Sequence, residues 1–136
     1  MRLNFSAFIL LFVFGSVLTA QAQLNEPITI KINQQKTVVK KELKVTFLAL
    51  VEDSRCPTDA QCIQAGSARI RVKVEGGKRA SLISELITGA KSNTIWFAGY
   101  AIKLIDLNPK PATNIRIDRN GYEATFNISK NRKISY

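Results

Sequence analysis

The chain has 136 residues, with 20 basic and 10 acidic side chains, two cysteines and no histidine. A chain of this length buries one hydrophobic core and rarely more. The absence of histidine excludes Ser-His and Cys-His catalytic dyads, and two cysteines alone supply too few ligands for a structural zinc site. No glycine-rich phosphate loop is present, so the sequence predicts no metal and no cofactor.

The N-terminus has the order of a secretory signal peptide. Arg2 supplies a positive charge, residues 7–18 are almost wholly apolar, and the small residues Ala20 and Ala22 follow where signal peptidase needs them. The apolar run is too short to cross a bilayer. We therefore predict a signal peptide over residues 1–22, with a buried N-terminal helix as the alternative.

Cleavage there would leave residues 23–136 as a single exported domain, periplasmic or extracellular. Only one of the 20 basic residues and none of the 10 acidic residues lies in the leader, so the mature domain carries about nine net positive charges. Export also predicts that the two cysteines are oxidised.

The mature chain shows the period of half-buried β-strands. Between residues 68 and 74, for example, apolar side chains alternate with basic ones. Reading in chain order predicts eight short strands, at residues 28–32, 43–51, 68–75, 78–84, 94–97, 100–107, 114–118 and 122–128. Residues 43–51 are apolar on both faces and are expected to form a central strand.

Pairs of turn residues separate several of these strands and predict hairpins, at Gly76 and Gly77, Ala98 and Gly99, and Asn120 and Gly121. A helix over residues 78–88 is the alternative to a strand there, and residues 57–64 could hold one helical turn. The pattern as a whole predicts an all-β, antiparallel sandwich-like domain, or a partly closed barrel, of about eight short strands.

Residues 52–66 depart from ordinary strand patterning, because they hold both cysteines, three acidic residues, a proline and a glycine. Cys56 and Cys62 have five residues between them, whereas a redox-active pair normally has two. We predict a local disulfide closing a seven-residue loop, which the chain-entropy model values at roughly 2–2.5 kcal/mol. A free reactive pair is the alternative.

This segment, E-D-S-R-C-P-T-D-A-Q-C-I-Q-A-G, resembles one found in small exported bacterial proteins of uncharacterised function. In that family the second cysteine is followed by I/V-W-A-G, and this chain has Gln64 in place of the tryptophan. The run F-A-G-Y-A-I-K-L from Phe97 and the sequence N-P-K-P from Asn108 are similar to the family as well. The resemblance implies no particular activity.

Within the segment, Asp53, Arg55 and Asp59 are candidate binding residues. One interpretation is structural: Asp53 or Ser54 caps a turn and Arg55 pairs with a carboxylate. Another is a rigid loop that offers Arg55 to a partner, as an inhibitor or adhesion loop does. A third places Glu52 and the two aspartates around calcium, although their spacing fits no standard calcium loop.

Arg69, Arg71 and Lys73 share one face of a predicted strand and are further candidate binding residues. The simpler interpretation is a solvated face that protects against edge pairing. The functional one is attraction to an anionic envelope surface, a glycan or another exported protein. Nucleic acid is not expected, because aromatic residues are not interleaved with the basic ones. Trp96 is predicted to be core rather than a sugar platform.

The sequence thus predicts a non-catalytic binding module with a disulfide-clamped loop and a basic surface. One alternative is a low-turnover hydrolase with two carboxylates, for which the acidic residues considered are Glu42, Glu52, Asp53, Glu75, Glu85 and Glu123. A purely structural envelope component is the other alternative.

Overall fold

The structure, a computed structural model, describes residues 26–40 and 42–130, and the predicted signal peptide lies outside them. All regular structure in this part of the chain is β-strand. The strands are β1 (Ile28–Lys31), β2 (Gln35–Val38), β3 (Leu43–Asp53), β4 (Ala68–Gly76), β5 (Arg79–Ile87), β6 (Thr94–Phe97), β7 (Tyr100–Asn108) and β8 (Glu123–Lys130). Over the same residues no helix is long and apolar enough to span a membrane.

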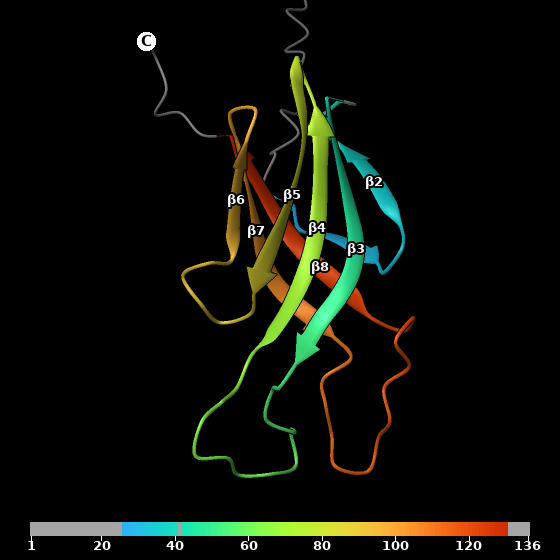
Figure 1. Cartoon of the computed structure of the whole chain (residues 1–136), viewed down its shortest axis with the longest axis vertical. Coiled ribbons are helices and arrows are strands. Elements are labelled where there is room, and N and C mark those ends of the chain that lie inside the picture. Colours follow the sequence, from blue (N-terminus) through green and yellow to red (C-terminus); the bar gives the residue numbers. More distant parts are fainter. Residues whose placement is uncertain (1–25, 41, 131–136) are drawn as a thin grey trace, which may run out of the picture.

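The strands form two four-stranded antiparallel sheets, which face each other as a sandwich (Figure 1). One sheet has the order β1-β8-β7-β6 and the other β2-β3-β4-β5. The two sheets are not joined into a closed barrel. This confirms the predicted all-β, sandwich-like single domain of about eight strands and decides against the barrel.

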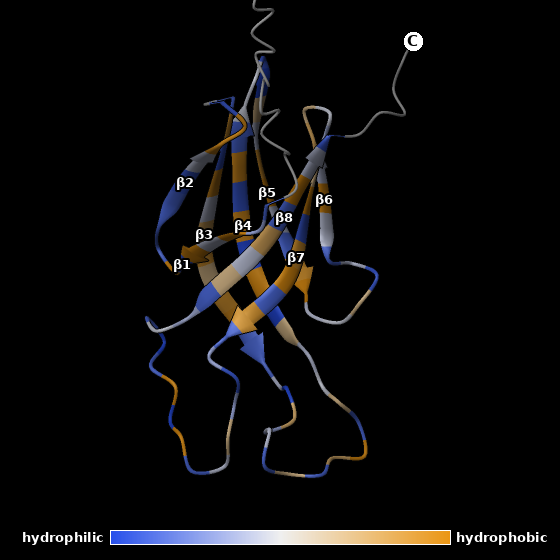
Figure 2. Cartoon of the chain, turned by 180° about the vertical axis from the view of Figure 1, so that it is seen from behind, coloured by the Kyte–Doolittle hydropathy of each residue, from blue (hydrophilic) through white to orange (hydrophobic). Residues whose placement is uncertain are grey.

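The core lies between the sheets and is made by the inward-facing side chains of both. On β4 the apolar residues between Ala68 and Val74 are fully buried, while the basic residues between them face outward. Figure 2 shows this alternation as bands of opposite hydropathy along β4. Phe47 of one sheet and Phe126 of the other are the largest fully buried side chains. The period-two pattern of the sequence therefore determines which face each strand buries.

Two of the predicted hairpins are present. β4 pairs with β5 around Gly76 and Gly77, and β6 pairs with β7 around Ala98 and Gly99. Residues 78–84 are thus strand and not helix. β3 lies between β2 and β4, as expected for a strand that is apolar on both faces. Residues 57–64 contain a turn, with the Ala60 N–H donating to the Pro57 carbonyl at 3.2 Å, and no helix.

The third predicted hairpin is wrong, because residues 114–118 lie in a loop. Asn120 and Gly121 do form a turn, in which the Gly121 N–H donates to the Asp118 carbonyl at 2.9 Å. However, β8 is already flanked by β1 and β7, so neither edge of β8 is open to a further strand. The eighth strand is instead β2, a mostly exposed strand that pairs with β3.

The prediction that Trp96 belongs to the core is also wrong. Its side chain is 63% exposed, whereas its neighbours Ile95 and Phe97 are buried. Successive residues of a strand point to opposite faces, so burial of both neighbours directs Trp96 outward. β6 lies at the edge of its sheet (Figure 1), and its outward-facing Trp96 is exposed to solvent.

Candidate functional site: the paired-loop end

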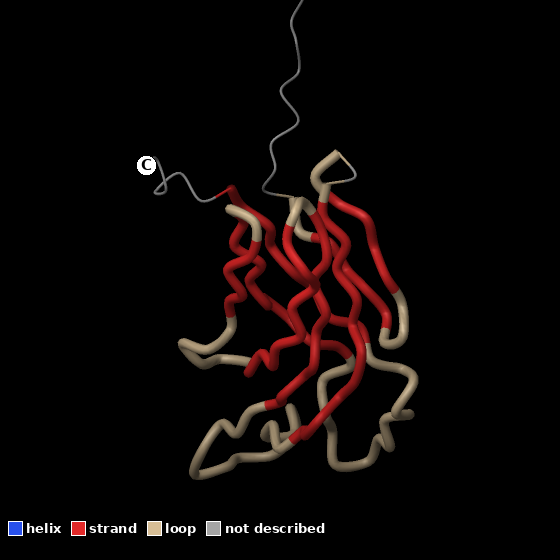
Figure 3. Tube along the Cα trace, turned by 45° about the horizontal axis from the view of Figure 1, so that its top comes forward, coloured by secondary structure: helices blue, strands red, loops and turns tan. Residues whose placement is uncertain are grey.

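Two long loops meet at one end of the sandwich. The cysteine loop, residues 54–67, connects β3 to β4, and the β7–β8 loop, residues 109–122, connects the two central strands of the other sheet. Figures 1 and 3 show both loops extending beyond the same end of the sheets. Loops at the end of a rigid β-sandwich commonly carry its binding residues, so this paired-loop end is the candidate functional site.

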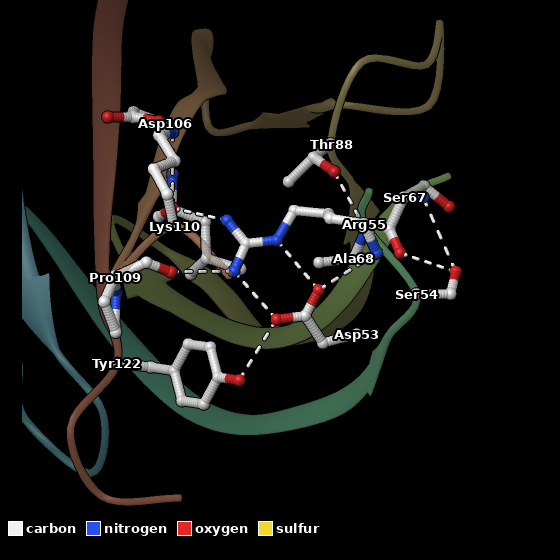
Figure 4. A network of polar contacts seen from close by, with 11 residues as sticks. Asp53, Ser54, Arg55, Ser67, Ala68, Thr88, Asp106, Pro109, Lys110 and Tyr122 are labelled. Atoms are coloured by element: carbon white, nitrogen blue, oxygen red, sulfur yellow. Dashed lines mark hydrogen bonds and ion pairs between the residues drawn. The ribbon is translucent and has the colours of Figure 1, made fainter. Parts of the chain in front are cut away.

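Asp53 and Arg55 form an ion pair at the base of these loops (Figure 4). Asp53 is the last residue of β3, and Arg55 follows it in the cysteine loop. The guanidinium Nε and Nη2 each donate to one carboxylate oxygen of Asp53 at 2.8 Å. Both side chains are only 11% exposed. A bidentate and nearly buried pair of this kind is stronger and more directional than a surface ion pair.

The same guanidinium also binds the other sheet. Its Nη1 donates to the carbonyl oxygen of Leu107 at 2.6 Å, and its Nη2 donates to that of Pro109 at 2.9 Å. The Tyr122 hydroxyl, just before β8, donates to Asp53 Oδ2 at 3.0 Å. We call this set the Asp53–Arg55 clasp. It connects the end of β3 to both ends of the β7–β8 loop (Figure 4).

The clasp shifts the protonation equilibria of its members. Burial raises the pKa of Asp53, but the hydrogen bonds and charge of Arg55, with the Tyr122 hydroxyl, outweigh it and bring that pKa below its ordinary 3.8. The hydrogen bond from Arg55 to Asp53 raises the pKa of the guanidinium. Burial, followed by the contact with Asp53, raises the pKa of Tyr122. Asp53 is therefore a stable carboxylate at neutral pH.

A second contact joins the two loops farther from the sheets. The Thr113 N–H donates to Asp59 Oδ1 at 2.9 Å, and the Thr113 hydroxyl donates to Asp59 Oδ2. The hydrogen bond from the Thr113 side chain, followed by that from its N–H, lowers the pKa of Asp59. Nearby, the Thr58 N–H donates to the Pro111 carbonyl at 2.9 Å. The cysteine loop and the β7–β8 loop are thus fixed to each other.

The predicted disulfide between Cys56 and Cys62 is present, with the two Cα atoms 6.0 Å apart. Hydrogen bonds along the stem of the loop reinforce it. The Cys56 N–H donates to the Ala65 carbonyl at 2.8 Å, and the Ser54 N–H donates to the Ser67 carbonyl at 2.8 Å. The Ser54 hydroxyl donates to the same Ser67 carbonyl at 2.9 Å (Figure 4). The disulfide is therefore one of several restraints on the cysteine loop.

Because these restraints are independent, removing the disulfide should loosen the loop without unfolding the domain. We expect the Cys56→Ser/Cys62→Ser variant to lose about 2 kcal/mol of unfolding free energy, the value for a short closed loop. Neither cysteine belongs to the core. Urea denaturation and circular dichroism of oxidised, reduced and double-serine proteins measure the effect. Global unfolding under mild reduction would contradict it.

The other candidate binding residues lie away from the paired-loop end, on the outer face of β4. Glu85 of β5 lies between Arg69 Nε, at 3.9 Å, and Arg71 Nη2, at 2.9 Å. Lys73 Nζ lies 2.8 Å from Glu75. The three basic residues share one face as predicted, but these carboxylates offset part of its positive charge. The role of this face in binding anionic partners stays a prediction.

The structure separates the residues of the calcium hypothesis. Asp53 faces Arg55 and Tyr122, whereas Asp59 faces Thr113. Within residues 26–40 and 42–130, no three histidine, cysteine or acidic side chains group in a way that could hold a metal ion.

Two of the carboxylates considered for hydrolysis lie together at the opposite end of the domain. Glu42 and Glu75 line a depression of about 480 Å³, and the Tyr100 hydroxyl donates to Glu42 at 3.1 Å. Of the other carboxylates considered, Asp53 is held in the clasp and Glu85 pairs with the arginines of β4. Glu123 pairs with Lys31, and Glu52 lies opposite Arg69 in the pairing of β3 with β4.

Comparison of the chain with protein-family models, with curated proteins and with solved structures gives no match. The resemblance to small exported bacterial proteins therefore stays a prediction. What the structure adds is a physical role for the motif residues, because Asp53, Arg55 and the two cysteines all restrain the paired-loop end.

Proposed function

We propose that this chain is a non-catalytic binding module of an exported protein and that the paired-loop end contacts its partner. The observation that carries this proposal is the Asp53–Arg55 clasp. It uses three guanidinium nitrogens to fix the two longest loops of the domain. Loops ordered before binding lose little conformational entropy on association, so more of the contact energy appears as affinity.

Each loop presents an exposed apolar side chain. Ile63 of the cysteine loop is fully exposed, and Ile115 of the β7–β8 loop is 58% exposed. Isolated exposed isoleucines are common on protein surfaces. On two restrained loops at one end of a domain, however, they supply apolar contact area that a partner can bury at low entropic cost. Arg55 contributes by holding the loops rather than by touching the partner.

The charge distribution favours an anionic partner. Arg116 and Arg119 are exposed on the β7–β8 loop and form no ion pair within the described part of the chain. With the net positive charge of the sequence, they would attract an anionic envelope surface or another exported protein. Export itself is supported by the disulfide, because disulfides persist in oxidising compartments.

Site-specific photo-cross-linking tests this proposal. A photoreactive phenylalanine is placed at Ile63 or Ile115, and at Ile83 of β5 as a matched control on an exposed strand. In cells that export the protein, positions 63 and 115 should yield adducts of one common mass, about fivefold or more above the control, if the loop tips form the interface. Equal adducts at all three positions, or none at the loops, would contradict the proposal.

A further inference from the structure

A second surface feature, separate from the paired-loop end, surrounds Trp96. In the pairing of β6 with β7, Trp96 lies opposite Ala101 and Thr94 lies opposite Lys103. In the next pairing, Ala101 lies opposite Ser129 and Lys103 opposite Asn127. Two parallel rows of residues therefore cross the outer face of three strands, and the tryptophan stands at the edge of one row.

These rows enclose a shallow depression on the outer face of the sheet. Its volume is about 430 Å³, within the range of roughly 300–1,000 Å³ typical of small-molecule sites. The lining residues are Thr94, Trp96, Ala101, Lys103, Asn127 and Ser129. Ala101 lies directly opposite Trp96 on the neighbouring strand β7. Because the side chain of Ala101 is a single methyl group, it does not cover the indole ring.

The lining combines an aromatic ring with polar side chains. It has one aromatic ring, 63% exposed, four side chains with hydroxyl, amide or ammonium groups, and no carboxylate. Lys103 forms no ion pair within residues 26–40 and 42–130. A site for a lipid or an apolar peptide would need a larger contiguous apolar area. A nucleic-acid site would need several aromatic residues along a basic groove.

A sugar ring has the complementary chemistry. One face of a pyranose presents polarised C–H groups, which are attracted to the electron-rich face of an indole. Its rim presents hydroxyl groups that exchange hydrogen bonds with amides and hydroxyls. A carboxylate on the ring would supply the counter-charge for Lys103, whose ammonium acts as a single point charge with three donors.

We propose that the Trp96 depression binds a pyranose ring that carries a carboxylate, as in a uronic acid. Trp96 stacks on the C–H face of the ring, and Lys103 pairs with the carboxylate. Thr94, Asn127 and Ser129 bind the ring hydroxyls. This site does not depend on the proposed role of the paired-loop end, because it involves other strands and another face.

The chain offers a direct probe of this site, because Trp96 is its only tryptophan. Titration with oligomers of galacturonic acid should shift the fluorescence of Trp96 to shorter wavelength and protect it from quenching by iodide. Trp96→Ala should weaken binding, measured by calorimetry, about tenfold or more, by analogy with the loss of one nucleobase stacked on an aromatic side chain. Trp96→Phe should retain part of the affinity, and circular dichroism verifies that both variants are folded.

Two further comparisons separate sugar recognition from simple charge attraction. Lys103→Gln should weaken binding of the acidic oligomer several-fold and leave the weaker binding of neutral galactose oligomers unchanged. Lys78 is an exposed lysine in the β4–β5 turn, and Lys78→Gln should change the binding of neither oligomer. Polyglutamate, which has the charge without the ring, should not protect Trp96. Equal protection by polyglutamate, equal effects of the two lysine variants, or no response to the acidic oligomer would overturn the proposal.

Discussion

Replacing Arg55 with alanine is expected to lower the unfolding free energy by about 3 kcal/mol, because it leaves a nearly buried carboxylate without its partner. The variant also removes the donors for the carbonyls of Leu107 and Pro109, which close the base of the β7–β8 loop. Equilibrium denaturation in urea measures the loss. Substitution of an ordinary surface residue usually changes the unfolding free energy by less than about 0.5 kcal/mol, so a loss of this size would distinguish Arg55 from the exposed basic residues.

Two matched variants locate the effect in the clasp. Arg69→Ala removes an arginine whose ion pair is half exposed, and we expect it to cost less than about 0.5 kcal/mol. Arg55→Lys keeps the charge but cannot form the bidentate pair, so it should recover only part of the loss. If Arg55→Ala and Arg69→Ala proved equally mild, the clasp would not stabilise the domain.

The clasp also predicts a dependence on pH. The folded-state pKa of Asp53 lies below its ordinary value of 3.8, so the unfolded chain takes up a proton first as the pH falls. The contribution of Asp53 to the unfolding free energy is therefore fully present above about pH 4–5, and it is lost as the pH falls through the folded-state pKa of Asp53. Asp53→Asn should have a flatter acid limb than the wild type in denaturation measured from pH 6 to pH 2.

The second large effect is expected at Gly66, where the cysteine loop returns to β4. Its φ is +65°, and a Cβ there would lie 2.8 Å from the carbonyl carbon of Ser54 and closer still to its oxygen. To remove this steric clash the backbone at Ser54 would have to move, but the hydrogen bond between Ser54 and Ser67 holds it in place. We expect Gly66→Ala to cost about 2–4 kcal/mol, from the left-handed conformation and the collision together.

Gly89 provides the matched control, because its φ is +68° and a Cβ added there would meet nothing within 4 Å. Gly89→Ala should therefore show only the cost of the left-handed conformation, about 1 kcal/mol. Urea denaturation of the two variants separates the steric term from the conformational one. Equal losses at both positions would show that the loop stem can move away from the added methyl group.

Most of the fold could be predicted because the strands that build the core bury every second residue. β4 and β8 are clear examples, because buried and less buried residues alternate in each strand up to its last residue. β2 could not be found in this way, since its four residues are mostly exposed and it is defined by pairing with β3. Residues 114–118 have a strand-like sequence, but no strand edge is open beside them.

The local part of the site was also predictable. The disulfide and the pairing of Arg55 with a carboxylate involve residues close together in the chain. The other contacts of Arg55 were not, because Leu107 and Pro109 lie 52 and 54 residues away and contribute carbonyl oxygens, which every residue carries. Tyr122 is 69 residues from Asp53 in the sequence. The sequence pattern predicts Tyr122 only as an apolar residue of a strand and does not indicate its hydrogen bond to Asp53.

The way in which Arg55 holds the β7–β8 loop has a consequence for protein engineering. The guanidinium binds main-chain carbonyls, so the attachment makes no demand on the side chains of Leu107 and Pro109 themselves. The tip of that loop, residues 114–116, is exposed and lies outside the clasp. New sequences could therefore be grafted between Thr113 and Ile117 while the anchor at the base is retained. The domain is in this sense a small disulfide-containing scaffold for displaying a variable loop beside a constant one.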